Sequence, residues 1–454
     1  MIRSMPEAEI DKEAVPLSIG SGKYLSLTTY QRKETAMTVD SIAQKRSSIK
    51  LDTLVIGIDL AKHTHVARAR FSDGSYSRPV KVPNNRAGFL ALFEQIDAWK
   101  ARPDSSVIVG VESTGSYGVN LVRWLSEHGC RVVLVPSLHV CREKELLDNG
   151  RGTSDDKDAL IIADLVARGQ YLGFVTLSDA CLELRPLVSL RTRLVKEQTG
   201  WLNALHQTMD VLFPEFETVF AGLSRPNVRL VLGRFGTVAA ARAHSPTAMR
   251  RRLVRDGAAR TSLAKLQRLQ AAAAESIGPL EVSASQERSL REMLETLSTL
   301  EARIAGLETE IARLLEQLPE SKYLMSVKGV GAMTAAVVLA ETGGLAQYSC
   351  ASAVLKLAGL NLYQVSSGQY RSGRHISKRG RSQLRRALHM VAVQHAKRGW
   401  PLEPYYTALV ARGKPKTVAL TAVCCRLVRL LYALVRDGRC YRECPPEAGR
   451  PQVA

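Results

Sequence analysis

The chain has 454 residues, about three times the ~150 of a typical domain, which predicts two or three domains rather than one. Its formal net charge of +20 favours a polyanionic partner, with nucleic acid as the first candidate. The hydrophobic fraction of 45% and the charged fraction of 23% exclude a chain that is disordered throughout.

Both ends of the chain differ from the middle. Residues 1–50 are polar and aperiodic, so we expect a poorly ordered tail there and a second tail at 437–454. The apolar stretch 421–435 is interrupted by Arg426 and Arg429, which argues against a membrane span. Scattered cysteines and the lack of a signal-peptide core predict a reducing cytoplasm.

The region 51–180 has the pattern of an α/β domain. Buried or alternating runs predict strands at 54–58, 66–71, 76–82, 107–111 and 131–135, and amphipathic runs predict helices at 89–100 and 118–128. Because three strands come before the alternating helices and strands, we expect a mixed sheet covered by helices rather than an all-parallel sheet.

Helical patterns follow in the region 181–319. We expect a basic helical linker at 181–280, in which residues 218–255 carry eight arginines and no acid and form a candidate polyanion surface. At 281–319, leucines and isoleucines recur every three or four residues, which predicts a coiled coil. Self-association is favoured, and packing against the chain's own core is the alternative.

Carboxylates follow two predicted buried strands. Asp59 and Glu112 each end such a strand, while Asp155 and Asp158 lie three apart at the start of a predicted helix and therefore on one face. Oxygen ligands without His or Cys suit Mg²⁺ or Mn²⁺, and paired ions assist displacement at phosphorus. Each acid alone has a structural explanation as a helix cap, turn residue or ion-pair partner, but the combination favours a metal site.

Two further acids on the same predicted helix complete the set of candidates. Asp156 is expected to point elsewhere and to be structural, and Asp164 is a weaker alternative ligand.

The region 320–436 is expected to be a mainly helical C-terminal domain. Residues 327–331, between predicted helices at 323–326 and 333–341, are similar to a helix-hairpin-helix, whose glycine amides contact phosphates. A simple tight turn is the alternative. Residues 342–402 contain ten Lys and Arg and no acid, which favours a phosphate-binding surface.

These motifs resemble those of a known family. The segments IGIDLAK around Asp59, GVESTGSY around Glu112 and DDKDA from Asp155 are similar to the DEDD signature of transposases of the insertion-sequence-one-ten family. The resemblance implies a RuvC/RNase H-like fold at 51–180, with Asp59, Glu112, Asp155 and Asp158 as catalytic metal ligands.

The segment GLNLYQVSSG, from Gly359, resembles the motif of the family's second domain that ends in a serine nucleophile. Counted from Gly359, the resemblance implies Ser367 as that nucleophile, with Ser366 as the alternative, and Leu362 stands where the family has Pro. The basic residues that we expect to bind nucleic acid are Arg371, Arg374, Lys378, Arg379, Arg381 and Arg385.

The resemblance implies a bacterial, nucleoid-associated transposase that cuts and rejoins DNA through a covalent phosphoserine. It further implies a divalent metal, a noncoding bridge RNA and a dimer or tetramer whose sites combine two subunits. Two alternatives remain from the residues themselves: a metal-dependent junction nuclease that uses water, and a noncatalytic nucleic-acid-binding protein.

Overall fold

The computed structural model forms two compact units by its internal contacts. One consists of residues 1–182 and 318–454, and the other of residues 183–317. The described residues are 42–43, 45–50, 52–112, 117–148, 155–171, 179–257, 261–348, 350–364, 366–367, 370–371, 373 and 375–442. The two predicted tails therefore lie largely outside the described residues.

A five-stranded mixed sheet of order β3-β2-β1-β4-β5 forms in the first unit. The strands are β1 (Leu54–Asp59), β2 (Thr64–Arg70), β3 (Val80–Pro83), β4 (Val107–Glu112) and β5 (Arg131–Val135). β2 pairs antiparallel with β1 and β3, whereas β1-β4 and β4-β5 are parallel. The predicted mixed sheet is confirmed, although β3 is shorter than the predicted strand because Tyr76 makes only an isolated bridge to Arg70.

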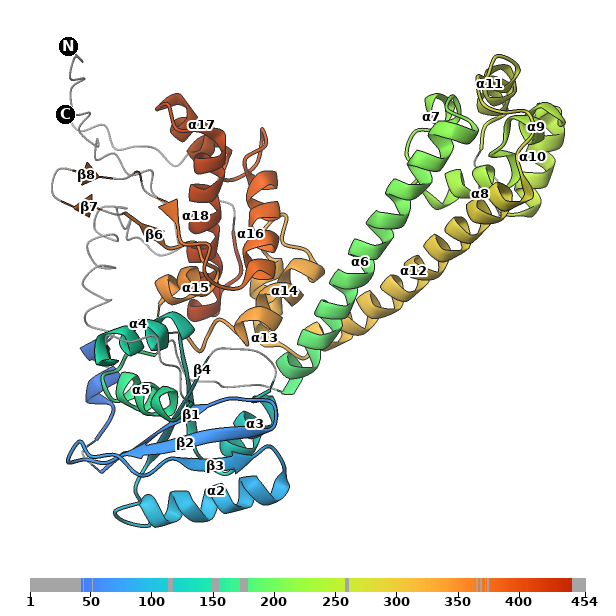
Figure 1. Cartoon of the computed structure of the whole chain (residues 1–454). Helices are drawn as coiled ribbons and strands as arrows, with labels where there is room; N and C mark the ends of the chain where they lie inside the picture. Colours follow the sequence, from blue (N-terminus) through green and yellow to red (C-terminus); the bar gives the residue numbers. More distant parts are fainter. Residues whose placement is uncertain are drawn as a thin grey trace, which may run out of the picture. The chain divides into compact units, whose positions relative to one another are not determined.

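Helices cover both faces of this sheet (Figure 1). α2 (Arg86–Trp99) and α3 (Val119–Glu127) pack on the face that presents Leu54, Ile56 and Ile58. α4 (Ser137–Asp148) and α5 (Asp155–Ala167) cover the opposite face. Because side chains alternate along a strand, residues at odd positions of β1 face α5.

The second unit is built on a long helical hairpin of α6 (Asp179–Leu212) and α12 (Ala284–Glu316) (Figure 1). The helices are antiparallel, since Arg191 contacts Glu308 and Thr208 contacts Met293. The hairpin tip carries α7 (Phe216–Val219), α8 (Pro226–Phe235), α9 (Val238–Arg242), α10 (Pro246–Arg255) and α11 (Leu263–Ala274).

The apolar seam of α12 is buried inside this unit. Leu300 and Ile304 cluster with Leu194 of α6, while Leu290 and Leu297 enter the core of the tip. The prediction of self-association through this seam is therefore wrong, because the chain's own helices already occupy it.

The C-terminal part of the first unit is mainly helical, as predicted. Its helices are α13 (Pro319–Met325), α14 (Ala332–Thr342), α15 (Ala351–Leu357), α16 (Ser382–His395), α17 (Glu403–Ala411) and α18 (Lys416–Asp437). Two antiparallel pairs of short strands lie between α15 and α16: β6 (Leu362–Tyr363) with β9 (His375–Ile376), and β7 (Ser366–Ser367) with β8 (Tyr370–Arg371).

α18 is long and apolar enough to cross a membrane by composition alone, with a mean hydropathy of 2.0 in its best window. Within the described residues, however, 61% of that window is buried, and the helix packs against α13, α15, α16 and α17. The guanidinium of Arg426 is buried over the ring of Tyr405 at 4.5 Å. α18 is therefore the core helix of this C-terminal part.

Candidate active site and nucleic-acid interface

Asp59 and Glu112 end two neighbouring parallel strands. Ile58 of β1 is the register partner of Val111 of β4, so the next residue on each strand is one of these acids. Both carboxylate residues are half-buried, and both lie on the face of the sheet that α5 covers. The strand register therefore brings the two acids to the same end of the sheet.

Two glycines let α5 lie directly on these strands. A Cβ atom at Gly57 would meet the backbone of Ala159 at 2.0 Å, and one at Gly110 would meet Val166 at 2.5 Å. Farther along the helix, Asp164 contacts Arg70, whose register partner is Val55 near the beginning of β1. Because the later turns of α5 lie near the start of β1, its first turn lies toward the end that carries Asp59.

Asp158 lies in the first turn of α5 and is paired with a lysine. Its Oδ2 atom accepts a 2.5 Å hydrogen bond from Nζ of Lys144, which lies on α4. The side chains of Lys144 and Asp158 are 23% and 13% exposed. The other carboxylate oxygen, Oδ1, is buried without a hydrogen-bond partner among the described residues.

The donor chemistry of these acids fits a hard divalent cation. All are carboxylates, and the orphaned Oδ1 of Asp158 is a buried oxygen that a cation would satisfy. Among the described side chains, which do not include that of Asp155, no three His, Cys, Asp or Glu residues already form a metal-ligating group. In this structure Lys144 supplies the positive charge beside Asp158.

The two other acids of α5 have different surroundings. Asp156 is exposed, in agreement with the expectation that it points elsewhere. Asp164 forms ion pairs with Arg70 and Arg168 and accepts a 3.2 Å hydrogen bond from Tyr76. Its partners give it a structural role at the end of α5 away from the candidate site.

Asn84 and His65, which the sequence did not single out, hold the loops after β1 and β4. The amide of Asn84 donates to the carbonyls of Lys62, at 3.1 Å, and Tyr117, at 3.3 Å. Nδ1 of the fully buried His65 accepts from the Ala61 amide at 3.1 Å, and burial lowers the pKa of this imidazole. Only the alternation of β2, which turns His65 inward, hinted at this role.

The predicted serine motif begins on a segment fixed by backbone contacts. Gly359 accepts a 2.9 Å hydrogen bond from the Lys378 amide, and Leu357 accepts one of 2.7 Å from Arg381. A Cβ atom at Gly380 would meet the Leu357 carbonyl at 2.2 Å, so the two segments lie in direct backbone contact.

The two candidate serines lie on the short ribbon of β7 and β8. Ser366 is the register partner of Arg371, and Ser367 that of Tyr370. The side chains of these four residues lie outside the described part of the structure.

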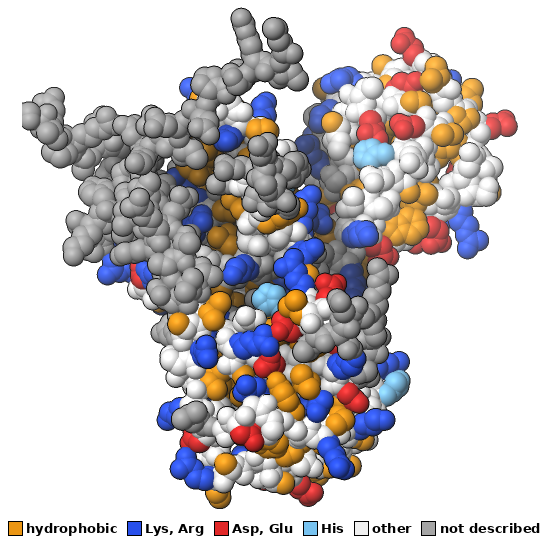
Figure 2. Space-filling view, turned by 60° about the vertical axis from the view of Figure 1, so that its left-hand side comes forward, with side chains coloured by type: hydrophobic (Ala, Val, Ile, Leu, Met, Phe, Trp, Pro, Cys, Tyr) orange, Lys and Arg blue, Asp and Glu red, His pale blue; other side chains and the backbone are white. Residues whose placement is uncertain are grey.

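The predicted nucleic-acid-binding residues have unequal surroundings. Lys378 and Arg379 are exposed, whereas Arg381 pairs with Glu341 at 3.7 Å and Arg385 donates to the Ala358 carbonyl at 2.9 Å. The Arg371 side chain and Arg374 lie outside the described residues. Figure 2 shows Lys and Arg side chains spread over the visible face among fewer Asp and Glu.

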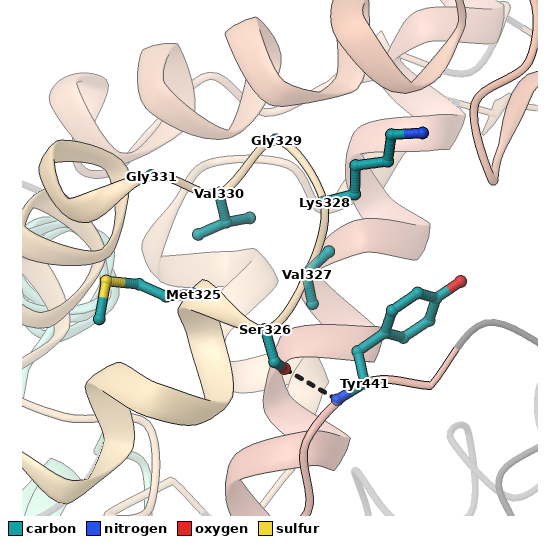
Figure 3. A pocket seen from close by; sticks show the side chains of 8 residues that line it. All are labelled: Met325, Ser326, Val327, Lys328, Gly329, Val330, Gly331 and Tyr441. Atoms are coloured by element: carbon teal, nitrogen blue, oxygen red, sulfur yellow. Dashed lines mark hydrogen bonds between the residues drawn. The ribbon is translucent and has the colours of Figure 1, made fainter.

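The loop between α13 and α14 lines an open pocket with residues 325–331 and Tyr441 (Figure 3). Gly329 has φ of +84°, a conformation that favours glycine, and Gly331 is the N-cap of α14. The Ser326 hydroxyl oxygen accepts from the Tyr441 amide at 2.8 Å. Two short helices joined by a glycine-bearing turn fit both the predicted helix-hairpin-helix and the alternative of a simple tight turn.

Comparison with known proteins decides the family. Residues 56–214 match a DEDD-type transposase model of IS110, and residues 321–407 match the model of the transposase IS116/IS110/IS902 family. The chain belongs to the IS116/IS110/IS902 family of transposases. The first matched region contains Asp59, Glu112, Asp155 and Asp158. The second contains the loop 327–331 and Ser367.

Two relatives match along most of the chain, and a third matches about half of it. The uncharacterized 43.6 kDa protein of insertion element IS110 from Streptomyces coelicolor is 29% identical, over 86% of this chain and 96% of its own length. The uncharacterized 44.8 kDa protein of insertion element IS116 from Streptomyces clavuligerus is 28% identical, over 88% of this chain and 98% of its own length. A probable family 20 transposase of Pseudomonas aeruginosa is 29% identical, over 47% of this chain and 59% of its own length.

Proposed function

We propose that this transposase cuts and rejoins DNA strands through a covalent phosphoserine intermediate, assisted by a divalent metal. The observation that carries the proposal is the position of Asp59 and Glu112 at the ends of adjacent parallel strands, with the first turn of α5 toward the same end. A RuvC-like catalytic domain at 51–180 and a serine domain at 320–436 are part of this proposal, as are the linker at 181–280 and the helical segment 281–319.

Each step of the proposed reaction replaces one phosphodiester bond with another. The Ser367 hydroxyl loses its proton and attacks the scissile phosphorus, a serine–phosphorus bond forms, and the leaving strand oxygen takes up a proton. In rejoining, a hydroxyl of another strand attacks the phosphoserine, and the serine oxygen is released and protonated. Because each broken P–O bond is replaced by a new one, no nucleotide hydrolysis is needed.

Asp59, Glu112, Asp155 and Asp158 would hold the Mg²⁺ or Mn²⁺ ions. A bound divalent ion supplies charge stabilisation to the phosphate oxygens during displacement. The protein's own contribution is to keep two acids rigid at the sheet edge, through the loop contacts of Asn84 and His65, and to hold Asp158 beside Lys144.

The test is trapping of the covalent intermediate. Full-length protein is incubated with element-end DNA and Mn²⁺, and SDS-stable adducts are counted. We expect an adduct with the wild-type protein and none with Ser367→Ala, while Ser366→Ala, the matched control one residue away, keeps it. Asp59→Asn should lower adduct formation by more than 100-fold, because charge stabilisation at phosphorus is lost.

Other outcomes would contradict the proposal. Free 5′ phosphate produced at full rate by Ser367→Ala would indicate a junction nuclease that uses water. Unchanged transposition in cells with Asp59→Asn would indicate a noncatalytic nucleic-acid-binding protein. An adduct that is lost in Ser366→Ala instead would move the nucleophile by one position.

A noncoding bridge RNA and a dimeric or tetrameric, nucleoid-associated assembly are further parts of the proposal. The basic composition of the chain is compatible with an RNA as well as a DNA duplex. Sequencing of the nucleic acid that copurifies with the protein tests the RNA, which should derive from the element's own flank. Loss of recombination after RNase treatment is expected, and full activity without RNA would contradict guidance.

A further inference from the structure

The hairpin tip of the second unit carries a strong excess of positive charge. Residues 218–274 contain eleven Lys and Arg and a single acid, Asp256. This segment lies between the two regions that match the family models, 56–214 and 321–407. The family match therefore assigns nothing to it.

Three of these arginines stabilise the tip itself. Arg229 is 7% exposed, pairs with Glu301 and donates to the Ser224 carbonyl at 2.8 Å. Arg234 binds Asp256 at 2.8 Å, and Arg242 donates to the Ala273 carbonyl at 2.7 Å. The only acid of the segment is thus already neutralised.

The helix α10 has a different arrangement. Its buried side consists of Met249 and Leu253, both fully enclosed. The rest of its surface carries four exposed arginines that have no ion pair or side-chain hydrogen bond within the described part of the chain: Arg250, Arg251, Arg252 and Arg255. Arg251 and Arg255 lie one turn apart, opposite the buried side.

We propose that the arginine face of α10 is a binding surface for the phosphate backbone of duplex DNA. Within the described residues, the surface is positively charged, carries no acidic side chain and has no pocket. These features suit the repeated phosphates of a nucleic-acid backbone better than a small ligand. We assign DNA to this surface because the chain belongs to a transposase family and transposases act on DNA. The inference rests on DNA as the substrate and does not depend on Ser367.

The contacts would be independent of sequence. Guanidinium groups on phosphates position a duplex without reading its bases. A helix of ten residues is about 15 Å long, enough to span several phosphates of one strand. The tip would thereby hold a duplex without selecting its sequence.

The experiment measures the salt dependence of binding. Full-length Ser367→Ala protein, which cannot form the adduct, is titrated onto a random-sequence 30-base-pair duplex at several NaCl concentrations. In this background, R251Q/R255Q should reduce the slope of log K against log salt by about two, because each phosphate contact contributes ~0.9. R251K/R255K should keep the slope, since the charge remains.

The matched control lies on α12 of the same unit. Arg288 and Arg291 are also exposed but stand among Glu287, Glu292 and Glu295, so R288Q/R291Q should leave the slope unchanged. An unchanged slope in R251Q/R255Q, or an equal loss in the control, would overturn the proposal. So would a loss of binding to anionic lipid vesicles with DNA binding intact, which would assign α10 to membranes.

These results are separate from those on the serine. If wild-type protein forms no adduct but the slope falls as expected, the α10 surface stands and the phosphoserine mechanism fails. If the adduct forms and the slope is unchanged, the reverse holds. Equal melting temperatures of the variants would show that the tip remains folded.

Discussion

The ion pair between Lys144 and Asp158 ties the acid site to α4. It joins two side chains that are mostly shielded from water, at 2.5 Å, and leaves Oδ1 of Asp158 buried and without a hydrogen-bond partner among the described residues. A lysine at this place has two effects with opposite consequences. It stabilises Asp158 when no cation is bound, and it repels a cation that approaches the same carboxylate.

We therefore predict that Lys144→Met raises the affinity of the full-length protein for Mn²⁺. Removing the positive charge should tighten binding by about tenfold, which is ~1.4 kcal/mol. In EDTA the same variant should lose about 1–2 kcal/mol of stability, because Asp158 loses its charged partner. Calorimetric titration measures the affinity, and urea unfolding measures the stability.

The control for this prediction is Asp158→Asn, which should weaken Mn²⁺ binding by at least tenfold. An equal Mn²⁺ affinity in Lys144→Met and wild type would mean that Asp158 does not ligate the ion. Asp156→Asn, an exposed position on the same helix, should leave the affinity unchanged.

At the scale of elements, the loop between α13 and α14 is anchored by one histidine of α16. His395 is 1% exposed, and its Nε2 donates to the Lys328 carbonyl at 2.6 Å. Nδ1 is buried without a partner among the described residues, so the neutral ring suits the site. Burial lowers the pKa of His395 below its ordinary value; the hydrogen bond to the Lys328 carbonyl raises this pKa, and the nearby Lys328 charge lowers it.

This anchor predicts a loss of stability in acid. A histidine with a lowered folded pKa contributes its full stability above the unfolded pKa of about 6.5, and loses it as the pH falls through the folded pKa. Urea midpoints measured from pH 7.5 to 5 should fall more steeply in the wild type than in His395→Phe. Burial also lowers the pKa values of His65 and His139, which are present in both proteins. The difference in slope between the wild type and His395→Phe therefore isolates the contribution of His395.

The matched control is His389→Phe, at an exposed position of the same helix, which should follow the wild-type pH profile. Parallel profiles of His395→Phe and wild type would show that the imidazole is protonated equally in the folded and unfolded chain. The loop would then not depend on the neutral ring.

Local sequence patterns predicted the elements better than the contacts between them. The strands β1, β4 and β5 follow from continuous apolar runs, and the acids that end β1 and β4 follow from the strand boundaries. The contacts of Asn84 with two loops, and of Lys144 with Asp158, join residues distant in the sequence, and no local pattern specifies them. For the same reason periodicity alone could not show which surface the α12 seam meets.

At the scale of the whole molecule, two compact units predict two unfolding transitions. Residues 183–317 have their own core, which includes Phe213, Phe216 and Phe235, and their own ion pair between the buried Arg229 and the half-buried Glu301. A unit with an independent core unfolds cooperatively by itself when few interactions couple it to the rest. The hairpin of α6 and α12 is the element on which this unit depends.

Two substitutions on α12 should move one transition in opposite directions. Glu301→Ala leaves the guanidinium of Arg229 buried without its carboxylate and should cost about 2–3 kcal/mol. Gly306→Ala introduces a Cβ atom into open space in a helix interior and should gain about 1 kcal/mol. Differential scanning calorimetry of the full chain should show one transition lowered by Glu301→Ala and raised a few degrees by Gly306→Ala, with the other unchanged. A single transition that shifts as a whole would mean that the units unfold together, and the α10 surface would then have to be tested within one cooperative fold.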